Sequence, residues 1–331
     1  MRRGRWDMVV CHATPDVWHR DGAFGWGKVE PCPPAGTALS IGRAMYESDR
    51  LPESWVSRIN AMDEVWVPSR FAVTQFINSG IHPGKIVVVP EAVDTELFDP
   101  SVHEPLEVDL GSSSLFRFLS VFKWEKRKGW DILLRAYFQE FTAADDVVLI
   151  IKTQSFHSGD NFESKVKQEI QKAQELSQGK PPRLKLLAKD LKLKELPGLY
   201  RSADAFVLPS RGEGWGRPHV EAMSMGLPVI ATNWSGSTEF LADGVSLPLR
   251  IEGLEPVEEG VKGHQWAVPS ETHLRELMRW LLDHRAQAVA LGEAARRHML
   301  DNFSPDAVIE KHVVPLLRRK TGGTRASSSE L

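Results

Sequence analysis

The sequence predicts an α/β protein built from two Rossmann-like domains, each organised around a parallel sheet. Short apolar segments alternate with helical segments in two series, one within residues 7–90 and the other within residues 118–232. Such alternation is typical of parallel sheets. The length of 331 residues also fits two domains, at roughly 100–200 residues each. The first series offers about three convincing strands, fewer than a complete doubly wound sheet contains, so we expect an incomplete N-terminal domain.

In the first series, the apolar segments are bounded by proline, serine or glycine, as buried strands are. The expected strands are residues 7–12, 64–67 and 85–90, and the expected helices are residues 53–62 and 70–79. Residues 13–40 are rich in glycine and proline and predict a long irregular loop. A loop of that length inside a compact domain is usually functional or disordered.

A linker is expected at residues 98–116, where prolines, serines and a glycine occur without periodicity. The elements expected beyond it are strands at 118–122, 147–152, 184–187, 205–208 and 229–232, helices near 129–141, 162–177, 194–201 and 217–225, a Gly/Pro-punctuated excursion at 244–268, and helices at 272–283, 285–300 and from Ser304 onward. The expected units are a partial N-terminal domain (1–105), a complete second domain (106–300), a C-terminal helix that packs back toward the first domain (301–320) and a disordered tail (321–331).

The composition argues against several classes of function. The net charge of −3 and the pI near 6.4 give no reason to expect a nucleic-acid or membrane-surface partner. Cys11 and Cys32 are the only cysteines, so we expect no disulfide framework, no cysteine-rich metal site and a reducing compartment. No apolar run approaches the roughly 18–20 residues that span a bilayer, and the N-terminal one is too short for a signal peptide. These observations predict a cytoplasmic protein.

The most informative segment is residues 204–233, DAFVLPSRGEGWGRPHVEAMSMGLPVIATN, which predicts strand, glycine-rich loop, helix, turn and strand. Gly212, Gly214 and Gly216 form the loop, and Pro218 suits the first helical turn, where its missing N–H would have no partner. A glycine-rich turn leading into a helix N-terminus is an anion site, because exposed amides and the positive end of the helix dipole point at the ligand. The segment therefore predicts a phosphate-binding loop.

Two carboxylates accompany this loop: Glu213 within it and Glu221 in the following helix. Carboxylates repel phosphate, so we expect them to accept hydrogen bonds from sugar hydroxyls beside it. A loop for phosphate and two acceptors for hydroxyls indicate a nucleotide sugar. Two alternatives remain: ordinary surface carboxylates, or an acid/base pair for glycoside hydrolysis. A hydrolase of plain sugars would not need the phosphate-type loop.

A second candidate segment, residues 123–130 (KWEKRKGW), is cationic. It lies between a strand and a helix and places positive charge where a diphosphate could bind. The alternative is a solvated charged loop. His12 ends a strand and is either a catalytic or a structural histidine, while Trp124, Trp215 and Trp234 either pack or form a platform for a sugar or base. Walker A and Gly-x-Ser-x-Gly patterns do not occur, and the Gly212–Gly216 segment has the wrong spacing for the Rossmann Gly-x-Gly-x-x-Gly pattern. That spacing argues against a nicotinamide enzyme.

These motifs resemble those of the retaining nucleotide-sugar glycosyltransferases of family 4, which have the GT-B fold. The segment PSRGEGWGRPHVEAMSMGLPVIAT resembles the Glu-x7-Glu signature of that family, and FLSVFKWEKRKGWDILLRAY resembles its Lys-Gly block. DEVWVPSRFAVTQFINSG and IVVVPEAVDTELFDP resemble the end of its first domain. Together these segments cover most of residues 60–245.

The resemblance implies two Rossmann-like domains that face each other across a cleft, and transfer of a sugar with retention of configuration from a UDP- or GDP-linked donor. In the family, the second acid holds the ribose, the first lies near the donor sugar, and two cations clamp the diphosphate. By resemblance the site comprises Glu221 on the ribose, Glu213 on the sugar, Lys128 with Lys123 or Arg127 on the diphosphate, and His12 near the donor sugar. We also expect the amides of Gly214, Trp215 and Gly216 to stabilise the leaving group, because it departs as an anion.

We expect no cofactor beyond the nucleotide-sugar co-substrate and no metal, because no Asp-x-Asp pair occurs in a suitable loop. The acceptor, whether carbohydrate, lipid or protein, is not specified by the sequence. The main alternative is a nucleotide-sugar binding protein without turnover, which the short first domain favours. A nucleotide-sugar epimerase on the same fold would need acid/base groups that the sequence does not identify.

Overall fold

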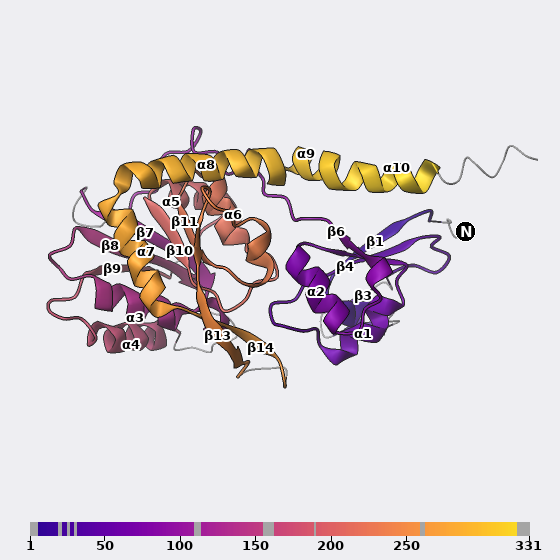
Figure 1. The fold of residues 1–331 in the computed structure, drawn as a ribbon, viewed down its shortest axis with the longest axis horizontal. Coiled ribbons are helices and arrows are strands. Elements are labelled where there is room, and N and C mark those ends of the chain that lie inside the picture. The colour runs from indigo at the N-terminus through magenta and orange to yellow at the C-terminus, as the bar shows by residue number, and fades with distance from the viewer. Residues whose placement is uncertain are drawn as a thin grey trace, which may run out of the picture.

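The computed structural model describes residues 6–18, 22–24, 27–29, 32–108, 114–154, 162–188, 190–258 and 262–322. Its chain forms two α/β domains side by side, joined along one edge by a line of C-terminal helices (Figure 1). Each domain has its own parallel sheet, which confirms the predicted fold class.

The N-terminal domain contains a four-stranded parallel sheet with the order β1-β4-β5-β6. The strands are β1 (Val9–His12), β4 (Ser40–Arg43), β5 (Glu64–Val67) and β6 (Ile86–Val88), and the helices are α1 (Glu53–Asn60) and α2 (Arg70–Asn78). Strand alternation explains how the sheet is covered on both faces. Val65 and Val67 pack in the cluster that contains the apolar residues of α1 and α2, whereas Trp66 points to the opposite face.

Two features of this domain correct the sequence-based expectations. The expected irregular loop at residues 13–40 contains a short hairpin, β2 (Gly22–Phe24) with β3 (Gly27–Val29), and runs into the unpredicted strand β4. Residues 19–21, 25–26 and 30–31 of that loop lie outside the described residues. β4 was missed because its sequence SIGR is short and has little apolar character.

The expectation for the cysteines was wrong, because Cys11 and Cys32 form a disulfide. Cys11 lies on β1, and Cys32 forms an isolated parallel bridge with Trp18, so both contacts join segments that are distant in the sequence and that no local pattern predicts. Disulfides persist mainly in oxidising compartments, so the cysteines no longer support a cytoplasmic location.

The second domain contains a six-stranded sheet with the order β12-β11-β10-β7-β8-β9, parallel throughout. This is the Rossmann order, with β7 as the first strand. The strands are β7 (Phe116–Lys123), β8 (Val147–Gln154), β9 (Arg183–Leu187), β10 (Ala205–Leu208), β11 (Val229–Thr232) and β12 (Leu247–Leu249). The central strands read as continuous apolar runs because helices cover both of their faces.

The sheet is covered by α3 (Trp130–Glu140), α4 (Phe162–Gln174), α5 (Leu196–Arg201), α6 (Arg217–Ser224), α7 (Glu271–Asp283) and α8 (Arg285–Phe303). The expected excursion at 244–268 instead contributes β12 and an antiparallel hairpin, β13 (Ile251–Pro256) with β14 (Gln265–Pro269). Its regular pairing depends on contacts with the domain rather than on a turn signature in the sequence.

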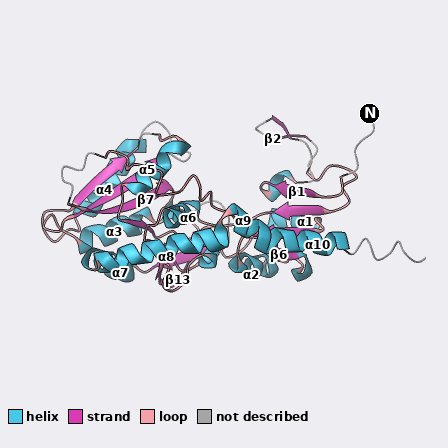
Figure 2. Cartoon of the chain, turned by 90° about the horizontal axis from the view of Figure 1, so that it is seen from above, coloured by secondary structure: helices cyan, strands magenta, loops and turns pink. Residues whose placement is uncertain are grey.

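The C-terminal helices cross from the second domain to the first. α8 is followed by α9 (Pro305–Val308), a π-helical turn (Ile309–Val313) and α10 (Val314–Gly322). From above, α8, α9 and α10 lie in one line over both domains (Figure 2). Val308 and Leu316 pack against Ile41, Trp66 and Val89, so these helices cover the second face of the N-terminal sheet. The expected tail lies, from residue 323 on, outside the described residues.

Candidate functional site

The candidate site lies where the strand order of the second sheet reverses. β7 and β10 are neighbours, and the connections that leave their carboxyl ends turn to opposite sides. In open α/β sheets, ligands bind in the crevice at such a switch point. One of the two connections carries the 3₁₀ helix Lys126–Lys128 and the other carries the glycine-rich loop. The structure therefore brings together two motifs that are about 85 residues apart in the sequence.

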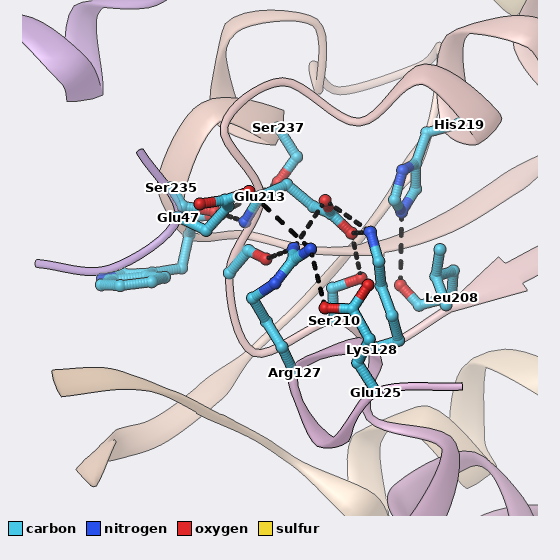
Figure 3. A network of polar contacts seen from close by, with 12 residues as sticks. Glu47, Glu125, Arg127, Lys128, Leu208, Ser210, Glu213, His219, Ser235 and Ser237 are labelled. Carbon is cyan, nitrogen blue, oxygen red and sulfur yellow. Dashed lines mark hydrogen bonds and ion pairs between the residues drawn. The ribbon is translucent and has the colours of Figure 1, made fainter. Parts of the chain in front are cut away.

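Glu213 is the centre of a network of polar contacts between these connections (Figure 3). Lys128 Nζ donates to both carboxylate oxygens, at 2.7 and 2.9 Å, and Arg127 Nη1 donates to Oε2 at 3.0 Å. Ser210 Oγ donates to Oε1 at 2.6 Å. The carboxylate side chain is only 7% exposed, so these donors replace the water that burial removes.

Nearby positive charges keep the Glu213 carboxyl group ionised. Burial alone would raise the pKa of Glu213, but Lys128, Arg127 and His219 together hold it well below its usual range. Burial alone would also lower the pKa of Arg127, but Glu213, Glu47 and Glu125 together outweigh that effect and raise it. Glu213 is therefore a carboxylate and Arg127 a cation at neutral pH, and the site presents fixed charges of both signs.

The two connections also dock against each other through their backbones. Arg127 accepts a hydrogen bond from the amide of Arg211 at 2.7 Å, and its guanidinium donates to the carbonyl of Gly212 at 2.7 Å. Gly129 adopts a left-handed conformation with φ of 66° and lies directly against the carbonyl of Pro209. Only a glycine permits both that conformation and that approach.

Glu221 is also buried, on α6, and its polar partners differ from those of Glu213. The hydroxyl of Tyr200 donates to its Oε2 at 2.8 Å, and Arg217 lies 3.7 Å away. Burial raises the pKa of Glu221, although Tyr200 and Arg217 oppose this shift. The two acids of the signature thus occupy different electrostatic environments.

The other predicted residues are distributed around this centre. Gly214 packs against Met45 of the N-terminal domain, and Gly216, with φ of 118°, precedes α6. The indole of Trp215 is only 2% exposed and packs against Phe240 and Phe303, so it is a core side chain rather than a stacking platform. Lys123 ends β7 with an exposed side chain.

His12 lies on the N-terminal domain, at the carboxyl end of β1. It lines a cavity of about 310 Å³ together with Arg43, Met45, Trp55 and Glu91. Met45 also contacts Gly214, so the cavity borders the glycine-rich loop. The structure therefore places His12 across the domain boundary from the Glu213 network.

A segment of the N-terminal domain, residues 45–49, closes over the loop. The carbonyl of Glu47 lies directly against Gly212, and its carboxylate is 3.8 Å from Arg127. Beyond it, Ser48 Oγ is 2.7 Å from Nδ1 of His264 on the β13–β14 hairpin. This segment was not predicted from the sequence, since nothing in MYESD distinguishes it from an ordinary loop.

Sequence reasoning also missed the side chains that support the network. Ser210, Tyr200, Arg211 and Asp131 each contact a predicted residue or its loop. Two of them could have been predicted from the sequence: Ser210 lies three residues before Glu213, and Arg211 directly precedes the glycine-rich loop. Asp131 could not have been found, because its partner is 80 residues away.

Comparison with known proteins places this chain in a family. The family model described as "Glycosyl transferases group 1" matches residues 114–282, just over half of the chain. The chain belongs to the group 1 glycosyltransferases. The matched region contains Lys128, Glu213 and Glu221, so the site described above lies within the part that defines the family.

Curated relatives and solved structures agree with this assignment. The chain is 30% identical over 232 residues to a D-inositol 3-phosphate glycosyltransferase of Catenulispora acidiphila, covering 66% of this chain and 48% of the relative. It is 27% identical over 159 residues to the lipopolysaccharide core mannosyltransferase LpsB of Rhizobium meliloti, covering 47% and 43% of the two chains. This group 1 chain thus spans about half the length of the curated relatives it matches.

Two solved structures share its fold. Anabaena HepE in complex with UDP and glucose gives a TM-score of 0.66 at 17% identity, covering 85% of this chain and 72% of HepE. Sucrose-phosphate synthase of Thermosynechococcus elongatus gives 0.67 at 17% identity, covering 87% and 69%. The group 1 chain therefore has the GT-B fold expected from its motifs. Within its described residues, no helix is both long and apolar enough to cross a bilayer.

Proposed function

We propose that this chain transfers a sugar from a UDP- or GDP-linked donor to an acceptor hydroxyl, with retention of configuration and without a metal ion. The observation that carries the proposal is the buried Glu213 carboxylate, held by Lys128 and Arg127 on the loops at the sheet switch point. The relatives named as glycosyltransferases, and a structural neighbour solved in complex with UDP and glucose, support this donor class.

In this proposal the two acids bind different hydroxyls of the donor. Glu221 accepts hydrogen bonds from the ribose, and Glu213 accepts them from the transferred sugar. The separate surroundings of the two carboxylates favour this division, because Tyr200 fixes one and Lys128 fixes the other. Each carboxylate is held in place before the donor arrives, which reduces the ordering cost of binding.

The leaving nucleoside diphosphate carries negative charge away from the sugar. Lys128, with Arg127 or Lys123, and the amides of Gly214, Trp215 and Gly216 would stabilise that charge as it develops. Fixed cations that lie at the diphosphate can provide the charge that a divalent ion provides in other transferases, which is why we propose a metal-independent reaction. Retention is proposed from the resemblance of the Glu213/Glu221 segment to the retaining enzymes.

The acceptor would enter from the N-terminal domain. The cavity beside His12 borders the glycine-rich loop through Met45. We propose that His12 orients the acceptor hydroxyl there, and that the covering segment at residues 45–49 excludes water. The acceptor itself is a carbohydrate, a lipid or a protein group that carries such a hydroxyl.

The alternative is a protein that binds nucleotide sugars without turnover. The four strands of the N-terminal sheet, against six in the second domain, favour it. Binding and transfer therefore have to be measured separately.

The decisive experiment incubates the purified chain with UDP- and GDP-linked sugars and measures both calorimetric binding and release of nucleoside diphosphate. We expect binding of one nucleotide class with release of its diphosphate. Glu221→Ala should weaken binding about tenfold or more, because it removes charge-assisted hydrogen bonds. Binding without release would support the non-catalytic alternative, and no binding by the wild-type chain would overturn both.

A further inference from the structure

A second ion-pair network lies behind the proposed donor site and joins the same two connections. Arg211 and Asp131 form a two-pronged pair, with Nη1–Oδ1 at 2.8 Å and Nη2–Oδ2 at 2.9 Å. Their side chains are only 5% and 9% exposed. None of the donor-binding residues proposed above belongs to this pair.

The guanidinium of Arg211 makes three kinds of contact at once. Nη1 also donates to the carbonyl of Lys126 at 2.9 Å, and Nε donates to Glu255 on the β13–β14 hairpin at 2.7 Å. Trp266 of the same hairpin donates its indole N–H to Glu255 at 3.0 Å. A planar guanidinium can serve these directions together, whereas a lysine ammonium cannot reproduce the geometry.

Its position relates these contacts to the site. Arg211 stands two residues before Glu213, and Lys126 stands two residues before Lys128. The bond between the Arg211 side chain and the Lys126 carbonyl therefore joins the two connections two residues before Glu213 and Lys128. The hydrogen bond from the Arg211 amide to the Arg127 carbonyl also holds the two connections together.

We propose that Arg211, paired with Asp131, is a positioning residue for donor binding: it holds the Lys128 connection and the Glu213 loop in register from behind. The inference rests on the proposed function for the identity of the ligand, a nucleoside diphosphate. A misplacement of about 1 Å can cost on the order of 100-fold in rate. A substitution that keeps the positive charge but loses the two-pronged guanidinium geometry therefore has a measurable effect on the site.

The test compares Arg211→Lys with a control pair remote from the site. Arg279 on α7 also donates to two carboxylates, to Asp145 at 2.7 Å and to Glu140 at 2.8 Å, although its side chain is 32% exposed against 5% for Arg211. Arg279→Lys therefore removes guanidinium bonds to carboxylates without touching either connection. Each variant is examined for melting temperature, for hydrogen–deuterium exchange of residues 126–129 and 209–216, and for calorimetric affinity for UDP and GDP.

We expect Arg211→Lys to increase exchange in both segments and to weaken nucleotide affinity about tenfold or more, because binding must then order two segments that are no longer held in advance. Arg279→Lys should lower the melting temperature but leave exchange in these segments and nucleotide affinity unchanged. Unchanged exchange in Arg211→Lys, or equal losses of affinity in the two variants, would overturn the inference. If the wild-type chain binds neither nucleotide, the proposed function fails, while the exchange data still decide whether Arg211 holds the two segments in register.

Discussion

At the scale of single residues, the site depends on a carboxylate that two cations keep ionised in a buried position. Glu213 receives donors from Lys128, Arg127 and Ser210, so its charge is fully balanced within the protein. Removing one partner of such a group leaves an uncompensated buried charge, which costs more than the pair contributes.

The depressed pKa of Glu213 gives stability a defined pH dependence. Because the folded value lies below the unfolded value of about 4.3, ionised Glu213 contributes its full stabilisation above that pH and loses it as the pH falls toward the folded pKa. Urea unfolding of the wild type and Glu213→Gln should therefore differ by a constant free energy between about pH 6 and 8, and by progressively less below about pH 4.3. A difference that grows on acidification would contradict this sign.

A double-mutant cycle measures the pair directly. Lys128→Met should reduce the free energy of unfolding by about 3 kcal/mol, because Glu213 keeps only part of its compensation. Lys128→Met with Glu213→Gln should cost clearly less than the sum of the two single variants, a coupling above about 1 kcal/mol.

The matched control is the exposed pair of Lys172 and Glu169, whose Nζ–Oε1 distance is also 2.7 Å. Its cycle should give a coupling below about 0.5 kcal/mol, because solvent screens it. Equal couplings in the two cycles would mean that burial adds nothing to the Glu213 pair.

At the scale of elements, the site is assembled from the connections that follow β7 and β10, and close packing at Gly129 sets how they meet. A Cβ at Gly129 would overlap the carbonyl oxygen of Pro209, a backbone atom that cannot move without shifting the loop. The contact joins the segments that carry Lys128 and Glu213.

Gly129→Ala should therefore lower both the unfolding free energy and the nucleotide affinity. Gly244 offers a matched control, because its φ is 77° and a Cβ there would have no atom within 4 Å. Gly244→Ala should cost only the left-handed backbone strain, about 1–2 kcal/mol, with unchanged affinity. Similar losses at both positions would show that packing against Pro209 does not matter.

Sequence periodicity predicted the elements whose burial is uniform and failed where burial comes from distant partners. The continuous apolar runs of β8 and β10 are buried in the centre of their sheet and were predicted closely. β4 and the β13–β14 hairpin owe their regularity to neighbours such as Trp18 and Asp49, which are remote in sequence. The same reason explains which site residues were predicted. Glu213, Glu221 and Lys128 lie in local sequence motifs, whereas Asp131 is recognisable only from its contact with Arg211, which is distant in the sequence.

At the scale of the whole molecule, the two domains meet directly over the proposed donor site. Glu47 approaches Arg127, the amide of Arg70 donates to Glu239 at 2.8 Å, and Phe71 packs edge-on against Trp234. The helices after α8 cross back and cover the N-terminal sheet (Figure 1). The domain arrangement thus places residues of the first domain against the glycine-rich loop, where an acceptor would have to meet the donor.

The central claim is that a nucleotide sugar binds between the Lys128 connection and the Glu213 loop. Hydrogen–deuterium exchange of the full chain, with and without saturating UDP-glucose or GDP-mannose, tests it most directly. We expect that one of these donors protects residues 126–129 and 210–221, while α7, which packs against α3, exchanges as before. Protection confined to other segments, or none with either donor or with the matching free nucleoside diphosphates, would contradict it.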